Sequence, residues 1–140
     1  MEVLPTIEGS STFPHLHSIV ATLRGENGCP WDIKQTPESL RNYLLEECQE
    51  LIEAIDHKDE KSICEEIGDV LFLLSFLISI YEERGQFSAS DVFRGIIAKM
   101  IRRHPHVFAG LQVTDEQSLH DQWIRIKAQE KEKGASKPQA

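Results

Sequence analysis

The sequence predicts an all-α fold built on an antiparallel helical hairpin, and two observations support this class. Helix start and stop signals divide the chain into segments of helical length, and no segment shows the polar–apolar alternation of a strand. No repeat with a period of 20–50 residues is present either. We therefore expect a bundle of four to five helices, over residues 13–24, 37–56, 62–84, about 91–103 and about 115–132.

The first two helices are predicted from apolar stripes. The stripe of the first helix has the spacing i, i+3, i+4, i+7 and consists of Leu16, Ile19, Val20 and Leu23. Thr36 before Pro37 is a typical start for the second helix. Its apolar face consists of Leu44, Cys48, Leu51, Ile52 and Ile55.

The later helices follow from composition and from cap signals. Residues 70–81 are apolar on nearly every side, which predicts a buried helix. Gly85 is a suitable residue to follow the end of that helix. Pro105 is expected to stop the fourth helix, and the capping-box pattern from Thr114 to Gln117 is expected to start the fifth.

Length and composition indicate one globular domain. A chain of 140 residues with 40% hydrophobic and 27% charged residues can form its own core. We expect a loose segment over residues 1–11, the domain over 12–132 and a disordered tail over 133–140.

Charge and cysteine content restrict the partners and the location. The net charge of -8 argues against binding a polymeric nucleic acid, because that affinity comes largely from basic residues on phosphates. The chain shows no secretory signal, and its longest apolar run is too short to span a membrane, which needs roughly 20 residues. Three cysteines at unremarkable spacing favour a reducing compartment, so we expect a cytoplasmic protein with no membrane partner.

Two acidic clusters, at residues 46–50 and 65–69, are the strongest candidates for a functional site. Glu50 and Glu66 lie equally far from Lys58 on opposite sides, and so do Glu47 and Asp69. If Lys58 lies in a turn between antiparallel helices, these four carboxylates meet at one level.

Within each helix the two acids are spaced i, i+3 and therefore neighbour one another, and the small Ala54 leaves room beside the first pair. Gly68, between the second pair, indicates close packing there. Four oxygen ligands suit Mg²⁺ or Mn²⁺. Solvated acidic faces are the alternative, but the mirrored pairs beside an apolar helix favour a metal site.

Basic and aromatic residues downstream could bind a nucleotide. Lys99 and Arg103 share a helix face and suit phosphates, although an ordinary basic helix end is the alternative. Trp123 and Lys127 are also spaced i, i+4, so the ring could stack on a base while the Lys meets phosphate. A core or interface Trp with a surface Lys is the alternative. For residues 28–32, a structural loop and a substrate lid both remain open.

Together these stretches resemble the MazG family of nucleoside triphosphate pyrophosphohydrolases. The matching stretches are Asn27–Asp32, Leu45-Glu46-Glu47-x-x-Glu50, Glu66-x-x-Asp69, Arg102–Phe108 and Trp123-x-x-x-Lys127. The resemblance covers roughly residues 16–130. It implies a helical bundle completed by homodimerisation, and Mg²⁺-dependent hydrolysis between the α- and β-phosphates to a nucleoside monophosphate and pyrophosphate.

The resemblance also implies roles for individual residues. It gives metal-ligand places to four acids, which are Glu47, Glu50, Glu66 and Asp69. It gives substrate-binding places to Lys99, Arg103, Trp123 and Lys127. Glu46 or Glu50 would orient or deprotonate the attacking water.

Two rival functions would also use a helical bundle with acidic residues. A di-iron carboxylate bundle usually uses Glu-x-x-His pairs, and neither cluster has His at i+3. A non-catalytic helical module that senses nucleotide or binds a partner is the second rival, and an assay of nucleoside triphosphate turnover would separate it from an enzyme.

Overall fold

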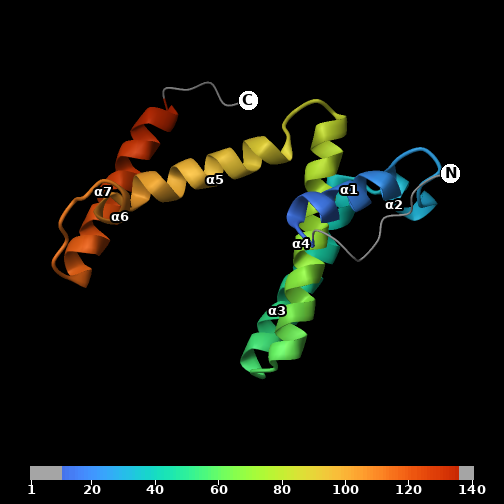
Figure 1. Ribbon diagram of the computed structural model, residues 1–140, viewed down its shortest axis with the longest axis horizontal. Helices are drawn as coiled ribbons and strands as arrows, with labels where there is room; N and C mark the ends of the chain where they lie inside the picture. Colours follow the sequence, from blue (N-terminus) through green and yellow to red (C-terminus); the bar gives the residue numbers. More distant parts are fainter. Residues whose placement is uncertain (1–10, 136–140) are drawn as a thin grey trace. The chain divides into compact units, whose positions relative to one another are not determined.

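The computed structural model describes residues 11–135, and within that range the chain is helical and contains no strand (Figure 1). Its helices are α1 Phe13–Arg24, α2 Pro30–Lys34, α3 Pro37–Asp56, α4 Glu60–Glu83, α5 Ala89–Arg103, α6 Pro105–Phe108 and α7 Glu116–Ala135. The predicted all-α class is therefore confirmed. The chain divides into two compact units, Met1–Ala89 and Ser90–Ala140, and each is described by itself below.

The helices α3 and α4 form the predicted hairpin, which is visible as two neighbouring ribbons in Figure 1. Thr36 starts α3 in a capping box with Ser39, and the Asp59 side chain accepts from the Ser62 N–H to start α4. Between the helices, Lys58 adopts a left-handed conformation with φ of 55°. This is the tight turn that the symmetry of the acids required.

A small apolar core holds α1 against the hairpin. Its buried members are Val20, Leu40, Leu73, Phe76 and Ile80. The apolar stripe predicted for the first helix supplies Val20 and the flanking Leu16. The expectation that residues 70–81 are buried is only partly correct, because Leu71 and Leu74 remain exposed.

Residues 28–32 were expected to form a loop, but the last three of them belong to the short helix α2. Five residues are too few to show a helical period, so sequence patterns could not reveal it. Gly28 lies just before α2, where an added Cβ would come within 2.2 Å of the Leu23 carbonyl oxygen. Only glycine permits this approach, which lets the Cys29 N–H donate to the same oxygen at 2.8 Å.

Arg24 connects α1 to α2 and to the end of α4 through hydrogen bonds and an ion pair. Its Nη1 donates to the carbonyl oxygen of the buried Asp32 at 2.6 Å, and its Nη2 pairs with the Glu83 carboxylate at 2.9 Å. The guanidinium also lies 5.2 Å from the centre of the Phe76 ring. These contacts give residues 28–32 a structural role, joining α1 and α2 to the end of α4.

The second unit confirms one predicted helix end and corrects one predicted helix start. Pro105 does end α5, but it also begins the short helix α6. The N-cap of α7 is Asp115, whose carboxylate accepts from the Ser118 N–H at 2.7 Å, so the prediction of a Thr114 capping box was wrong. An ionised carboxylate one residue closer to the helix competes better for that orphan N–H than a hydroxyl does.

The predicted ends of the chain are only partly described. The helix α7 continues to Ala135, so the first three residues of the predicted tail are helical. Residues 136–140 and the predicted loose segment 1–10 lie outside the described range. None of the described helices combines the length and the apolar character that crossing a membrane requires.

Candidate functional site

Three of the predicted metal ligands converge on the hairpin. Ligand oxygens of Glu47, Glu66 and Asp69 all lie within 4.8 Å of one another. The Glu50 carboxylate lies beside them, in contact with those of Glu47 and Glu66, although it does not belong to the tight group of three. The predicted meeting of the acids across the Lys58 turn is therefore confirmed, with Glu50 at the edge.

This acidic cluster, Glu47, Glu50, Glu66 and Asp69, lacks a compensating cation. Among residues 11–135 none of its members forms a salt bridge. One carboxylate oxygen of Glu47 and one of Glu66 are shielded from solvent without a hydrogen-bond donor. Shielded carboxylate oxygens without a donor are costly, so this arrangement fits a divalent cation with oxygen ligands.

The electrostatics of the cluster agree with its geometry. Desolvation, followed by the neighbouring Glu50 charge, raises the pKa of Glu66 to about 7. The pKa of Glu47 is also raised, first by desolvation and then by the charges of Glu50 and Asp69. Without an added cation, the folded protein therefore holds these carboxylates at a cost, and a bound cation would lower both pKa values.

The surroundings of the acidic cluster bear on two further predictions. A hollow of about 300 Å³ beside it is lined by Glu50, Ala54 and Glu66, which agrees with the expected room next to Ala54. The expected close packing at Gly68 was wrong, because an added Cβ would meet no atom within 4 Å there. Glu46 is exposed, and no described residue forms a hydrogen bond or ion pair with it.

The predicted substrate-binding residues belong to the second unit. Arg103 and Lys127 line one hollow of about 510 Å³, and Lys99 lies one turn before Arg103 on α5. The Lys127 Nζ lies 4.4 Å from the centre of the Trp123 ring, as a cation–π contact. Trp123 is 40% exposed, which excludes a core Trp but is compatible with an interface Trp.

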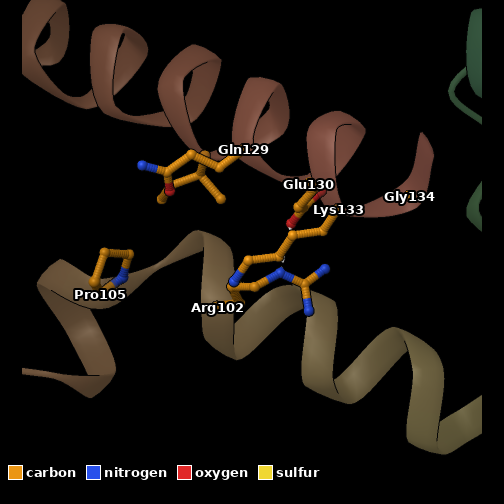
Figure 2. A pocket seen from close by; sticks show the side chains of 7 residues that line it. Arg102, Pro105, Gln129, Glu130, Lys133 and Gly134 are labelled. Atoms are coloured by element: carbon orange, nitrogen blue, oxygen red, sulfur yellow. Dashed lines mark hydrogen bonds and ion pairs between the residues drawn. The ribbon is translucent and has the colours of Figure 1, made fainter. Parts of the chain in front are cut away.

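Two neighbouring residues escaped the sequence analysis. Lys131 lines the same hollow as Arg103 and follows Lys127 by one helical turn, a spacing that could have revealed it. Glu130 accepts hydrogen bonds from both Arg102 and Arg103, and these bonds lower its pKa to about 2. No sequence pattern links it to arginines on a different helix. Figure 2 shows Arg102 and Glu130 reaching toward one another from α5 and α7.

A family model described as the MazG nucleotide pyrophosphohydrolase domain matches residues 35–108, more than half of the chain. The chain belongs to the MazG family. The part matched by the MazG model contains all the candidate acids, Lys99 and Arg103, whereas Trp123 and Lys127 lie beyond it.

Individual MazG relatives agree with this assignment. The nucleoside triphosphate pyrophosphohydrolase/pyrophosphatase MazG of Thermotoga maritima is 50% identical over 92% of this chain and 49% of that protein. The uncharacterized protein YabN of Bacillus subtilis is 50% identical over 85% of this chain and 24% of that protein. The chain thus spans about half or less of these two relatives.

A solved structure supports the MazG fold. The crystal structure of a mazG-related protein from Thermotoga maritima matches with a TM-score of 0.68 at 25% identity. The match covers 82% of this chain and 98% of that one. The helical architecture is therefore shared over most of both chains.

Proposed function

We propose that this MazG chain hydrolyses nucleoside triphosphates, ribo or deoxy, between the α- and β-phosphates, releasing a nucleoside monophosphate and pyrophosphate. The observation that carries the proposal is the acidic cluster, whose shielded oxygens lack donors and whose pKa values are raised. Two supporting facts are the match to a nucleotide pyrophosphohydrolase domain and the printed name of the Thermotoga maritima relative.

Glu47, Glu66 and Asp69, with Glu50 beside them, are proposed to hold Mg²⁺, for which Mn²⁺ would substitute. A cation bound there would offset phosphate charge and acidify a water ligand. The general base is proposed to be Glu50, since its carboxylate is exposed, adjoins the others and is not part of the tight group. The side chain of Glu46, the other candidate, forms no hydrogen bond or ion pair with a described residue that would fix its position.

The second unit is proposed to bind the substrate. Lys99 and Arg103 would bind phosphate oxygens and stabilise the charge that develops on the leaving pyrophosphate. Trp123, which is partly exposed, would stack on a nucleobase, and Lys127 would add a cation in the hollow that Arg103 also lines. These roles rest on residue chemistry and on the family resemblance.

The decisive test combines a substrate panel with isotope labelling. The protein is incubated with each ribo- and deoxynucleoside triphosphate and Mg²⁺ in ¹⁸O-labelled water. Attack at the α-phosphorus breaks its bond to the bridging oxygen and places the label in the monophosphate, leaving the pyrophosphate unlabelled. Label in pyrophosphate, or release of orthophosphate, would contradict the proposed bond. Nucleotide binding without any turnover would instead favour the sensing module.

We also infer that the chain forms a homodimer. Apolar side chains recur along one stripe of α4, at Ile67, Leu71 and Leu74, and all three are exposed. A second exposed stripe on α3 contains Leu45 and Ile52. Contiguous apolar surface of this kind usually marks an interface, and a second copy of the chain is the occupant that the resemblance implies.

Sedimentation analysis tests the dimer. The wild-type protein is expected to sediment as a dimer, and Leu71→Lys is expected to shift it toward the monomer, because a charge would be buried at the interface. Lys61→Glu, also on α4 but outside the apolar stripe, is the control and should leave the dimer intact. A wild-type monomer at all concentrations would contradict the inference.

The inferred location is the cytoplasm. All three cysteines, Cys29, Cys48 and Cys64, are free thiols in the structure, which suits a reducing compartment. Cell fractionation with an antibody against the chain would check this location, and recovery in a secreted fraction would contradict it.

A further inference from the structure

Glu130 on α7 accepts hydrogen bonds from two guanidinium groups, those of Arg102 and Arg103. Its Oε1 accepts from the Arg102 Nε at 2.7 Å, and its Oε2 accepts from the Arg103 Nη2 at 2.9 Å and Nε at 3.3 Å. The side chains of Arg103 and Glu130 are only 16% and 19% exposed, whereas Arg102 is 49% exposed. The contact with Arg103 is therefore the better shielded of the two and the more able to fix a rotamer.

The donors of Arg103 are divided between two edges of its guanidinium. Glu130 occupies the edge formed by Nε and Nη2. The Nη1 group donates to none of the residues in the described range. A guanidinium held along one edge presents its end, Nη1 and the second Nη2 hydrogen, as a fork that matches two phosphate oxygens.

The space around Arg103 also suits an anion. Its hollow of about 510 Å³ contains three cationic side chains, Arg103, Lys127 and Lys131, and Glu130 is its only acid. Arg102 lines a different pocket, of about 440 Å³, to which Glu130 also belongs (Figure 2). Of the two arginines, Arg103 is the one that shares a hollow with the predicted substrate lysine, Lys127.

We propose that Glu130 is a positioning residue, which holds the Arg103 guanidinium so that its free end binds a phosphate group of the substrate. Glu130 does not touch the substrate itself and acts through Arg103. The proposal rests on the proposed function and adds to it a residue outside the acidic cluster. Lys131 extends the same phosphate-binding hollow.

Two other roles for Glu130 give different results. If the ion pairs of Glu130 only hold α5 and α7 together, replacing Glu130 would lower stability but leave substrate affinity unchanged. A carboxylate that competes with phosphate for Arg103 would weaken binding, so its removal would tighten it. The positioning role predicts that removing Glu130 weakens binding, because the released Arg103 side chain loses rotamer entropy when it binds phosphate.

The test measures steady-state kinetics and pyrophosphate binding for Glu130→Gln. The KM for the triphosphate and the Kd for inorganic pyrophosphate are both expected to rise about tenfold, typical for groups that orient a ligand-binding residue. The value of kcat should fall as well, because a mispositioned Arg103 would also stabilise less of the charge that develops on the leaving pyrophosphate. Glu130→Asp, which keeps the charge, should recover part of the affinity.

Two controls separate the positioning role from a structural one. Arg102→Gln removes the other ion pair of the same carboxylate and should change KM by less than about fivefold, the limit for an exposed pair. In an Arg103→Ala background, Glu130→Gln should have no further effect on KM, since a residue that acts through Arg103 has nothing left to position. Thermal melting of each variant confirms folding.

The outcomes are distinct from those that decide the proposed function. If the wild type turns over no triphosphate, the proposed function fails, while pyrophosphate affinity still tests Glu130. An unchanged or lower Kd in Glu130→Gln, or an additive effect in the Arg103→Ala background, would overturn the proposal. So would a folded wild type that binds no pyrophosphate.

Discussion

The acidic cluster on the α3–α4 hairpin and the basic cluster on α5 and α7 differ in how their charges are compensated. The basic cluster consists of Arg102, Arg103, Lys127 and Lys131, with Glu130 among them. In the first, Glu66 has a pKa raised to about 7, and shielded carboxylate oxygens lack donors. In the second, Glu130 has a pKa lowered to about 2, because Arg103 and Arg102 donate to it. The first cluster has no counterion among the described residues, whereas the carboxylate of the second is paired with arginines of the same chain.

This difference explains what each site needs from its ligand. A cation bound at the hairpin relieves an existing repulsion, so its binding energy includes the removal of that cost. A phosphate bound near α7 finds an arginine that is already oriented and still has free donors. The first site thus gains from neutralisation and the second from preorganisation.

The largest expected effect is on turnover at the acidic cluster. Glu47→Gln or Asp69→Asn should lower kcat by more than about a hundredfold, the upper end found for groups that only support a metal ligand. Without metal, each variant should melt no lower than the wild type, because a repelling charge has been removed. Glu65→Gln, the same change at an exposed neighbour, is the control. Near-normal rates at saturating Mg²⁺ would remove these residues from the site.

Metal affinity should depend on pH at this site. Because the raised pKa of Glu66, about 7, leaves the carboxyl partly protonated at neutral pH, a cation must displace a proton. Affinity for Mn²⁺ alone should fall by up to about tenfold per pH unit below that value. Calorimetry in buffers of different ionisation enthalpy would detect the released proton. An affinity that stays constant from about pH 8 to about pH 6 would contradict the raised pKa.

The stabilising ion pairs of Glu130 should respond to pH in a much more acidic range. The folded-state pKa of Glu130, about 2, lies below its ordinary value of 4.5, so its ion pairs stabilise the fold above pH 4.5. That contribution is lost as the pH falls toward 2. The melting temperature of Glu130→Gln should therefore lie below that of wild type at neutral pH and converge with it in acid. Arg94→Gln, which removes an exposed pair on α5, should differ little from wild type at any pH.

The smallest effect is expected at the turn that carries the acids. Lys58 has a φ of 55°, which is strained for any residue with a Cβ. Lys58→Gly should raise the free energy of unfolding by about 0.5–1 kcal/mol, as measured by urea titration. Lys61→Gly, within the first turn of α4, should lower it by about 1 kcal/mol. A destabilising Lys58→Gly would mean that the lysine side chain makes a contact worth more than the strain.

Sequence patterns predicted the long helices and the meeting of the acids, because both depend on local spacing. Thr36, Pro37 and the symmetry about Lys58 act within a few helical turns, where periodicity is informative. Sequence patterns failed where a helix was too short to show a period, or where interacting residues lay on different helices. The helix α2 is too short to show a period, and Glu130 lies on a different helix from its arginines.

Two local errors have a common physical cause. Gly68 was expected to mark close packing and Thr114 to cap a helix, and both expectations came from residue type alone. A glycine allows another group to approach the backbone closely but does not show that one does. Which residue caps a helix depends on how well neighbouring side-chain acceptors compete for the free N–H groups. Gly28 shows the contrasting case, in which a backbone oxygen does occupy the Cβ position.

The tight turn at Lys58 also has a consequence for how the chain folds. The four acids lie on two adjacent helices that one short loop connects. Little chain entropy is therefore lost in bringing them together. The hairpin must nevertheless close against their mutual repulsion when no cation is present. Replacing one of these carboxylates by its amide should therefore speed closure of the hairpin while it removes turnover. Function and rapid folding make opposing demands on the same few side chains.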